Sequence, residues 1–134
     1  MFRAENCMES IAEDDLYSAV VIVGGRTTTE ALNCPQATEF VERHYKRKKL
    51  IAATCTGLVA ISALHILKNH KVTVHSRLKD RVEAREYSDQ ALTLDENVLT
   101  SRGIVTILDF ALKIVEILAG TEAKESVEYE ILTD

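Results

Sequence analysis

A stretch in the middle of the chain, residues 50–64, combines a strand signal, a sharp turn and a helix signal. The apolar run from Leu50 to Thr54 has the length of a strand and stops at Cys55, and Gly57 follows two residues later. Beyond this glycine the apolar residues recur at helical spacing. They are Leu58, Ile61 and Leu64. This order predicts a buried strand, a tight turn and a helix that continues to about Asn69.

A cysteine on a turn between a strand and a helix is a nucleophile-elbow arrangement. The free N–H groups and the positive dipole end of a helix N-terminus favour the thiolate form of a nearby cysteine. Cys55 is therefore a candidate nucleophile. The alternative is that Cys55 is a buried and inert cysteine, which is the commoner fate of this residue type.

Strand and helix signals alternate along the rest of the chain. Residues 18–23 are mostly β-branched and apolar, which predicts a strand buried on both faces, and Gly24 and Gly25 end it. Pro35 predicts the start of a helix. Further strands are predicted at 71–75, 90–94 and 98–101, a helix at 104–119 and a polar tail at 122–134. The alternation predicts an α/β domain with a mainly parallel sheet.

His75 ends the strand predicted after the elbow helix. If this strand is parallel to residues 50–54, His75 and Cys55 meet at the carboxyl edge of the sheet, where open α/β folds bind ligands. Such a pair can act as nucleophile and general acid/base. His44, His65 and His70 are interpreted as surface or helix-face residues.

Length and composition narrow the function class. A chain of 134 residues fits one domain, which we divide into an acidic lead-in at 1–16 and a folded part at 17–134. The net charge of −5 argues against a general nucleic-acid binder, and the basic residues at 43–49 are better explained as a charged helix end. Cys7, Cys34 and Cys55 form no C-x-x-C pair, so no metal site is predicted.

The location predicted from the residues is the cytoplasm. Charged residues or histidines interrupt every apolar segment before it reaches membrane-spanning length. The acidic start of the chain is unlike a transit peptide.

Five stretches in order resemble the ThiJ/PfpI superfamily, and within it the Parkinson-disease-linked protein deglycase branch. The resemblance runs from about Tyr17 to the C-terminus. The stretches that carry it are Val20–Gly25, Leu50–Gly57, Lys71–His75, Leu99–Gly103 and Phe110–Glu116.

The resemblance implies a flavodoxin-like three-layer sandwich. It assigns Cys55 as nucleophile and oxidation sensor, His75 as its acid/base partner, and the backbone amides of Gly25 and Thr56 as an oxyanion pocket. The implied role is an oxidative- or carbonyl-stress response, with cysteine-dependent deglycase or glyoxalase-type activity on methylglyoxal-derived adducts. Two alternatives stay open: a non-enzymatic redox sensor or chaperone that works through oxidation of Cys55, and a shortened isoform with little activity.

The resemblance also bears on cofactors, partners and location. It implies no cofactor, small aldehydes or glycated molecules as substrates, and mitochondrial or nuclear pools besides the cytoplasmic one. It implies a homodimer, although the family's dimerisation helix lacks a counterpart in this sequence. Neither a nucleic acid nor a membrane is expected as a partner.

The sequence departs from the family pattern in its first part. Family members open with a β-α-β segment that supplies a first strand, the dimerisation helix and a glutamate that contacts the cysteine. We therefore expect an N-terminally shortened fold in which the strand at 18–23 lies at an open sheet edge. Asp14 and Asp15 precede that strand, and at about 3.3 Å per residue they lie more than about 15 Å from the elbow. They cannot replace the glutamate.

Smaller departures lie beside the pocket. Ser76 stands where the deglycase branch has a proline, and Ile104-Val105 stands where it has a proline–glycine pair.

Overall fold

Four strands form the central sheet of the computed structural model, which describes residues 8–133. Their order is β1 (Ala19–Ile22), β2 (Leu50–Thr54), β6 (Val98–Ser101) and β5 (Leu92–Asp95). β1, β2 and β6 are parallel, and β5 pairs antiparallel with β6. The predicted α/β fold with a mainly parallel sheet is confirmed.

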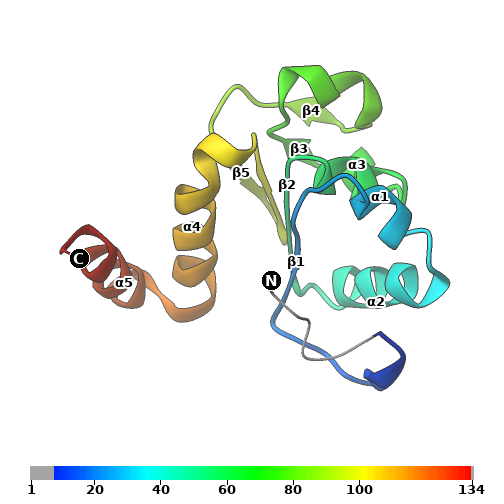
Figure 1. Cartoon of the computed structure of the whole chain (residues 1–134), viewed down its shortest axis with the longest axis horizontal. Helices are drawn as coiled ribbons and strands as arrows, with labels where there is room; N and C mark the ends of the chain where they lie inside the picture. Colours follow the sequence, from blue (N-terminus) through cyan, green and yellow to red (C-terminus); the bar gives the residue numbers. More distant parts are fainter. Residues whose placement is uncertain (1–7, 134) are drawn as a thin grey trace.

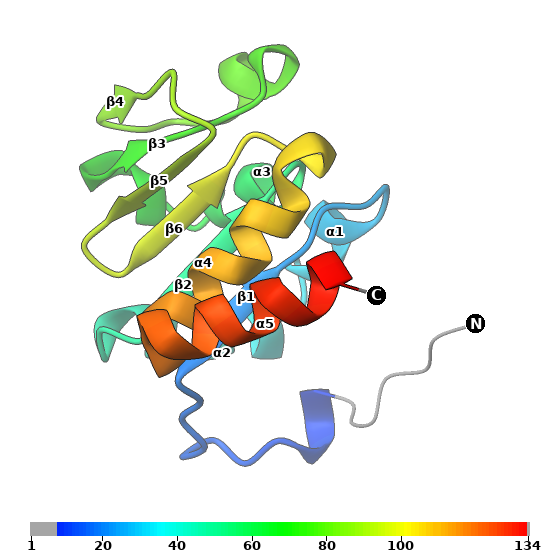
Figure 2. The same cartoon turned by 90° about the vertical axis from the view of Figure 1, so that its left-hand side faces the viewer.

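Helices cover both faces of this sheet (Figure 1). On one face lie α1 (Thr28–Ala31), α2 (Pro35–Lys46) and α3 (Gly57–Ser62). On the other lies α4 (Ile107–Ala119), and α5 (Thr121–Thr133) packs beside α4 (Figure 2). Short 3-10 turns connect these elements: η1 (Met8–Ser10), η2 (Ile66–Asn69), η3 (Ser76–Arg81) and η4 (Ile104–Thr106).

β2 is buried on both faces, as its continuous apolar run predicts. Ile51 and Ala53 belong to the core beneath α1–α3, and Leu50 and Ala52 belong to the core that includes Phe110 of α4. All five residues of the strand are buried. The strand that leads to Cys55 is thus held rigidly in the middle of the domain.

β1 differs from the prediction in its burial. Within residues 8–133 it is an edge strand, which confirms the expected open edge. Val20 and Ile22 face the core, but Val21 and Val23 are 45% and 59% exposed, so burial on both faces is wrong. The β-branched composition favours a strand and does not define its neighbours. An apolar edge strand without a charge or a proline can pair with another chain.

The strand predicted at 71–75 is shorter and lies elsewhere. β3 comprises Lys71–Val72 and pairs in parallel with β4 (Glu86–Tyr87) in a separate two-stranded sheet. Beyond β3, the Thr73 N–H donates to Thr100 Oγ1 at 2.9 Å, where a ladder would use a main-chain carbonyl. The chain beyond β3 is therefore bonded to a side-chain hydroxyl of β6.

Two helix predictions are also corrected. The helix after Cys55 ends at Ser62, and His65, with φ of 59°, separates it from η2. The predicted polar tail is α5. Its sequence shows little amphipathic pattern, which fits a helix that packs mainly against α4 and has no buried residue in the described part of the chain.

Two of the three histidines interpreted as surface or helix-face residues are buried, and one of them, His44, does lie on a helix, α2. The His44 Nε2 accepts a hydrogen bond from the Tyr17 N–H at 2.9 Å, and the His70 Nε2 bonds the Tyr45 hydroxyl at 2.9 Å. His65 is exposed, as predicted. Both ring nitrogens of His44 are bonded, whereas the His70 Nδ1 has no hydrogen-bond partner and lies 3.7 Å from Asp95 Oδ2.

Across residues 8–133, the helices are too short or too polar to cross a bilayer.

Candidate functional site

Cys55 occupies a strained turn between β2 and α3. It follows the last residue of β2 directly and has φ of 54°, in the left-handed region that residues other than glycine seldom adopt. Its side chain is half-buried, and it is a free cysteine. The predicted elbow geometry is therefore present, and the sulfur sits between the interior and the surface.

Gly57 allows α3 to begin where it does. A Cβ at this position would lie 2.3 Å from the Ile22 carbonyl oxygen at the end of β1. Because that atom belongs to the backbone of a paired strand, it cannot move aside cheaply. The close approach of α3 to β1 fixes the turn that carries Cys55.

Gly24 is a site residue that the sequence analysis passed over. A Cβ on Gly24 would lie 2.7 Å from Cys55 Cβ and 2.9 Å from the Thr56 amide nitrogen. The glycine pair after β1 was the available signal, and Gly25 was selected from it. Gly24 is the member that lies against the cysteine.

Thr56 joins the elbow to the glycine loop through its hydroxyl. The Gly25 N–H donates to Thr56 Oγ1 at 2.8 Å, and the same hydroxyl donates to the Gly25 carbonyl at 3.0 Å. The two residues predicted to form an oxyanion pocket therefore lie together. The Gly25 amide is already bonded to the threonine, so a substrate oxyanion has to compete with that hydroxyl.

His75 is exposed and is the cap residue that precedes η3. Its Nδ1 accepts a hydrogen bond from the Arg77 N–H at 3.2 Å, which requires an unprotonated Nδ1. In the neutral ring the proton then lies on Nε2, which leaves that atom to donate a hydrogen bond to a ligand. Among the residues described, the structure records no hydrogen bond between His75 and Cys55.

Strand register brings Cys55 and Arg102 to one edge of the sheet, and a side-chain hydrogen bond ties the segment that leads to His75 to the same strand, β6. Thr54 of β2 is paired with Ser101 of β6, so Cys55 and Arg102 directly follow neighbouring strand ends. Thr73, two residues before His75, bonds Thr100 of β6. His75 was expected to end a strand parallel to β2 in the same sheet, but β3 belongs to a separate two-stranded sheet. The hydrogen bond from Thr73 to Thr100 joins the segment before His75 to β6.

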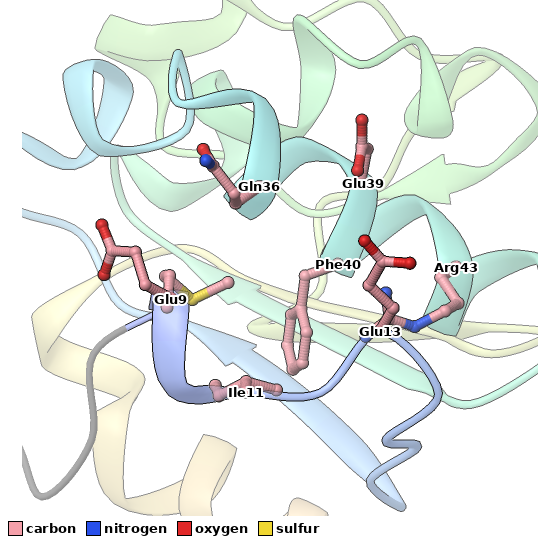
Figure 3. A pocket seen from close by; sticks show the side chains of 8 residues that line it. Glu9, Ile11, Glu13, Gln36, Glu39, Phe40 and Arg43 are labelled. Carbon is pink, nitrogen blue, oxygen red and sulfur yellow. The ribbon is translucent and has the colours of Figure 1, made fainter.

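A cavity of about 290 Å³ lies beside His75. Cys55 is not among its lining residues, which are Val74, His75, Ser76, Lys79, Tyr87, Ser88, Asp89 and Arg102. Another cavity, of about 310 Å³, lies between residues 8–13 and α2 and contains none of the predicted site residues (Figure 3). The cavity at His75 therefore adjoins one of the predicted site residues, while Cys55, Gly25 and Thr56 lie outside its lining.

Within the described ranges, no cluster of three or more histidine, cysteine or acidic residues could hold a metal ion. Cys7 lies outside the described residues.

Comparison with known proteins decides the family. The model of the DJ-1/PfpI family matches residues 1–117. The chain belongs to this family. It is 34% identical over 136 residues to the Parkinson disease protein 7 homolog of Danio rerio, covering 98% of this chain and 72% of that relative. It is 33% identical over 112 residues to the glutathione-independent glyoxalase DJR-1.2 of Caenorhabditis elegans, covering 82% of this chain and 60% of that relative.

Solved DJ-1 structures share the fold. Oxidized DJ-1 of Toxoplasma gondii aligns with a TM-score of 0.88 at 23% identity, over 98% of this chain and 72% of that chain. The flavodoxin-like architecture of the family is therefore the fold of this chain. The chain spans between 60% and 72% of the length of the three family members named above.

Proposed function

We propose that this chain acts on small 2-oxoaldehydes such as methylglyoxal, with Cys55 as nucleophile and His75 as proton carrier. The observation that carries the proposal is the left-handed turn at Cys55, with φ of 54°, which holds the sulfur at the mouth of the elbow. Strain of this kind persists where the surrounding structure enforces it, and it is concentrated at functional sites. The relative named a glutathione-independent glyoxalase supports the same reaction class.

The proposed reaction needs no external oxidant. The Cys55 thiolate adds to the aldehyde carbon, a carbon–sulfur bond forms, and the carbonyl oxygen takes the electron pair and then a proton. His75 removes the proton from that carbon through Nδ1, which requires the Arg77 N–H to give up its hydrogen bond to that atom, and a proton is delivered to the neighbouring carbon. The aldehyde carbon is thereby oxidised to a thioester while the ketone is reduced to an alcohol. Water hydrolyses the thioester, which releases a 2-hydroxy acid and the thiol.

The amides of Gly25 and Thr56 are proposed to stabilise the oxyanion of the first step. For Gly25 this requires the Thr56 hydroxyl to exchange its hydrogen bond with the substrate, because the Gly25 N–H donates to that hydroxyl at 2.8 Å. Release of glycated amines or thiols by the same nucleophile is the deglycase form of this chemistry. It needs the same two side chains.

Lactate formation from methylglyoxal, followed by proton NMR, tests the proposal. We expect turnover by the parent chain, loss of turnover in Cys55→Ala and little change in Cys34→Ser, whose thiol donates to Gln36 far from the elbow in sequence. Equal turnover by the parent and Cys55→Ala contradicts the proposal.

A redox sensor is the second candidate, and one observation favours it. In the described part of the chain the half-buried Cys55 thiol is free and has no hydrogen bond to His75. A peroxide would oxidise the thiolate to sulfenic acid, with an alcohol or water as leaving group. Mass spectrometry that finds selective oxidation of Cys55, in protein that makes no lactate from methylglyoxal, supports the sensor over the enzyme.

A further inference from the structure

The cavity beside His75 is lined by more cationic than anionic groups. Lys79 of η3 and Arg102, the first residue after β6, stand on its wall, and Asp89 is the lining carboxylate. This excess of positive charge lies on a chain whose net charge is −5. The charged side chains that line the cavity therefore have a net positive charge, whereas the chain as a whole has a net negative charge.

Neither cation is neutralised by a carboxylate. Some cations close in sequence are paired, as Lys71 is with Glu86 at 2.8 Å and Arg85 is with Asp95 at 3.1 Å. For Lys79 and Arg102 the structure records no salt bridge within residues 8–133. Two unpaired cations at the wall of one cavity favour an anionic ligand.

Both cations are held in place by contacts that leave them donors. Arg102 Nη2 donates to the carbonyl oxygens of Asp89 and Gln90, at 2.5 and 3.4 Å. The guanidinium has further N–H donors on Nε and Nη1. The Lys79 ammonium lies 4.8 Å from the centre of the Tyr87 ring, which also forms part of the wall. A cation–π contact restrains this group without using its charge on a carboxylate.

We propose that Lys79 and Arg102 bind the carboxylate of the substrate, so that the preferred substrates are 2-oxoaldehydes or their adducts that carry a carboxylate group. This proposal rests on the proposed function, since it names the substrate class of the same site. Arginine and lysine donate charge-assisted hydrogen bonds to carboxylate oxygens. The volume of about 290 Å³ limits the ligand to a small molecule of roughly one ring.

The strand register places the backbone of Arg102 beside that of the nucleophile. Arg102 and Cys55 each directly follow one partner of the Thr54–Ser101 pair. Neighbouring strands lie about 4.8 Å apart, and the Arg102 guanidinium extends toward Asp89 and Gln90, so a ligand bound to it has to project out of the cavity to bring its carbonyl to the elbow. His75 lines the cavity and can exchange protons with a ligand held there.

Binding is tested apart from turnover. Benzoate and benzamide, which share shape and differ in charge, are titrated into Cys55→Ser protein while amide and imidazole signals are followed by NMR. We expect benzoate, and not benzamide, to shift the signals of His75, Lys79 and Arg102. Lys79→Gln should weaken benzoate binding about five-fold, which is the size of a solvent-exposed ion pair. Lys46→Gln is the control, because Lys46 lies on α2 and pairs with Glu42.

Asp89→Asn gives a change of opposite sign. Removal of the cavity's carboxylate should strengthen benzoate binding by about two- to five-fold. A loss of structure would weaken binding instead, so this variant separates electrostatics from folding. Turnover of 4-carboxyphenylglyoxal and of phenylglyoxal is then compared in the parent chain. We expect higher kcat/KM for the charged compound, and loss of that preference in Lys79→Gln.

The outcomes separate the two proposals. Benzoate binding without turnover of either arylglyoxal supports the anion site and overturns the proposed reaction. Equal turnover of both arylglyoxals, with no shift caused by benzoate, overturns the anion site and leaves the reaction standing. Weaker benzoate binding by Asp89→Asn contradicts the electrostatic assignment.

Discussion

Replacement of Cys55 by glycine should stabilise the protein relative to replacement by alanine. Both changes remove the thiol, so the difference between them reports the backbone. With φ of 54°, a residue bearing a Cβ is strained by about 1–2 kcal/mol. Glycine removes this strain and costs about 0.5–1 kcal/mol in added freedom of the unfolded chain. We therefore expect the free energy of unfolding of the Cys55→Gly variant to be about 0.5–1 kcal/mol higher than that of the Cys55→Ala variant.

Ala111 supplies the matched control. It is exposed in the middle of α4, where glycine in place of alanine should lower the free energy of unfolding by about 1 kcal/mol. Urea denaturation measures both substitutions. With a slope of about 2 kcal/mol per molar urea, the midpoints should move by roughly 0.2–0.5 M in opposite directions. If glycine destabilises position 55 as it does position 111, the elbow is not strained and the inference drawn from it fails.

Three further changes test the contacts around the elbow and on the surface. Gly57→Ala should lower the free energy of unfolding by about 1–3 kcal/mol, measured by urea denaturation, because the added methyl group would lie 2.3 Å from the Ile22 carbonyl oxygen. Alanine favours helices, so an unchanged midpoint would refute the close approach of α3 to β1. Thr56→Val removes the hydroxyl that forms two hydrogen bonds to Gly25 and should lower the free energy of unfolding by about 1–2 kcal/mol by the same method. Thr56→Ser keeps the hydroxyl and should be nearly neutral, so equal losses in the two variants would contradict the role of these hydrogen bonds. The hydrogen bond from Lys48 lowers the pKa of Glu96, so an NMR titration of Lys48→Met should find the Glu96 pKa moved up toward its ordinary value. Because the pKa is lowered in the folded state, any stability from this pair is present at neutral pH and is lost as the pH falls through the folded pKa.

The elbow could be predicted from the sequence because its determinants are local. An apolar run of strand length, a stop at Cys55 and a glycine two residues later specify a strand, a turn and a helix start. The length of the helix after Cys55 could not be predicted from the local sequence. It ends at Ser62, and the chain turns through a left-handed His65 into η2. Histidine is enriched in this conformation but adopts it seldom, so the residue type alone does not mark the end of a helix.

Strand neighbours could not be predicted from single strands. The β-branched run at 18–23 has the composition of a central strand, yet β1 lies at an edge of the sheet with Val21 and Val23 exposed. Burial depends on which strands and helices lie beside a segment, and composition does not contain that information. The same limit applies to β3, whose pairing with β4 joins residues from two separate short segments.

Part of the candidate site could be predicted as a group of neighbours, while the chemical roles of its residues stay predictions. Thr56 and Gly25 bond each other next to Cys55, and His75 has no recorded bond to Cys55 among the described residues. The proximity of Gly24 to the cysteine and the bond from the Gly25 amide to the threonine hydroxyl depend on the exact approach of two loops. Such approaches are set by packing across the sheet, so they are visible only in three dimensions.

Competitive alkylation, read residue by residue with mass spectrometry, tests most directly whether the fold presents a reactive sulfur at the elbow. Cys34 and Cys55 are both half-buried free cysteines of the same molecule, so each experiment contains its own reference. We predict that iodoacetamide labels Cys55 faster than Cys34 in the folded protein, and that the two rates converge in urea. Slower labelling of Cys55 than of Cys34 in the folded protein would contradict its assignment as the nucleophile.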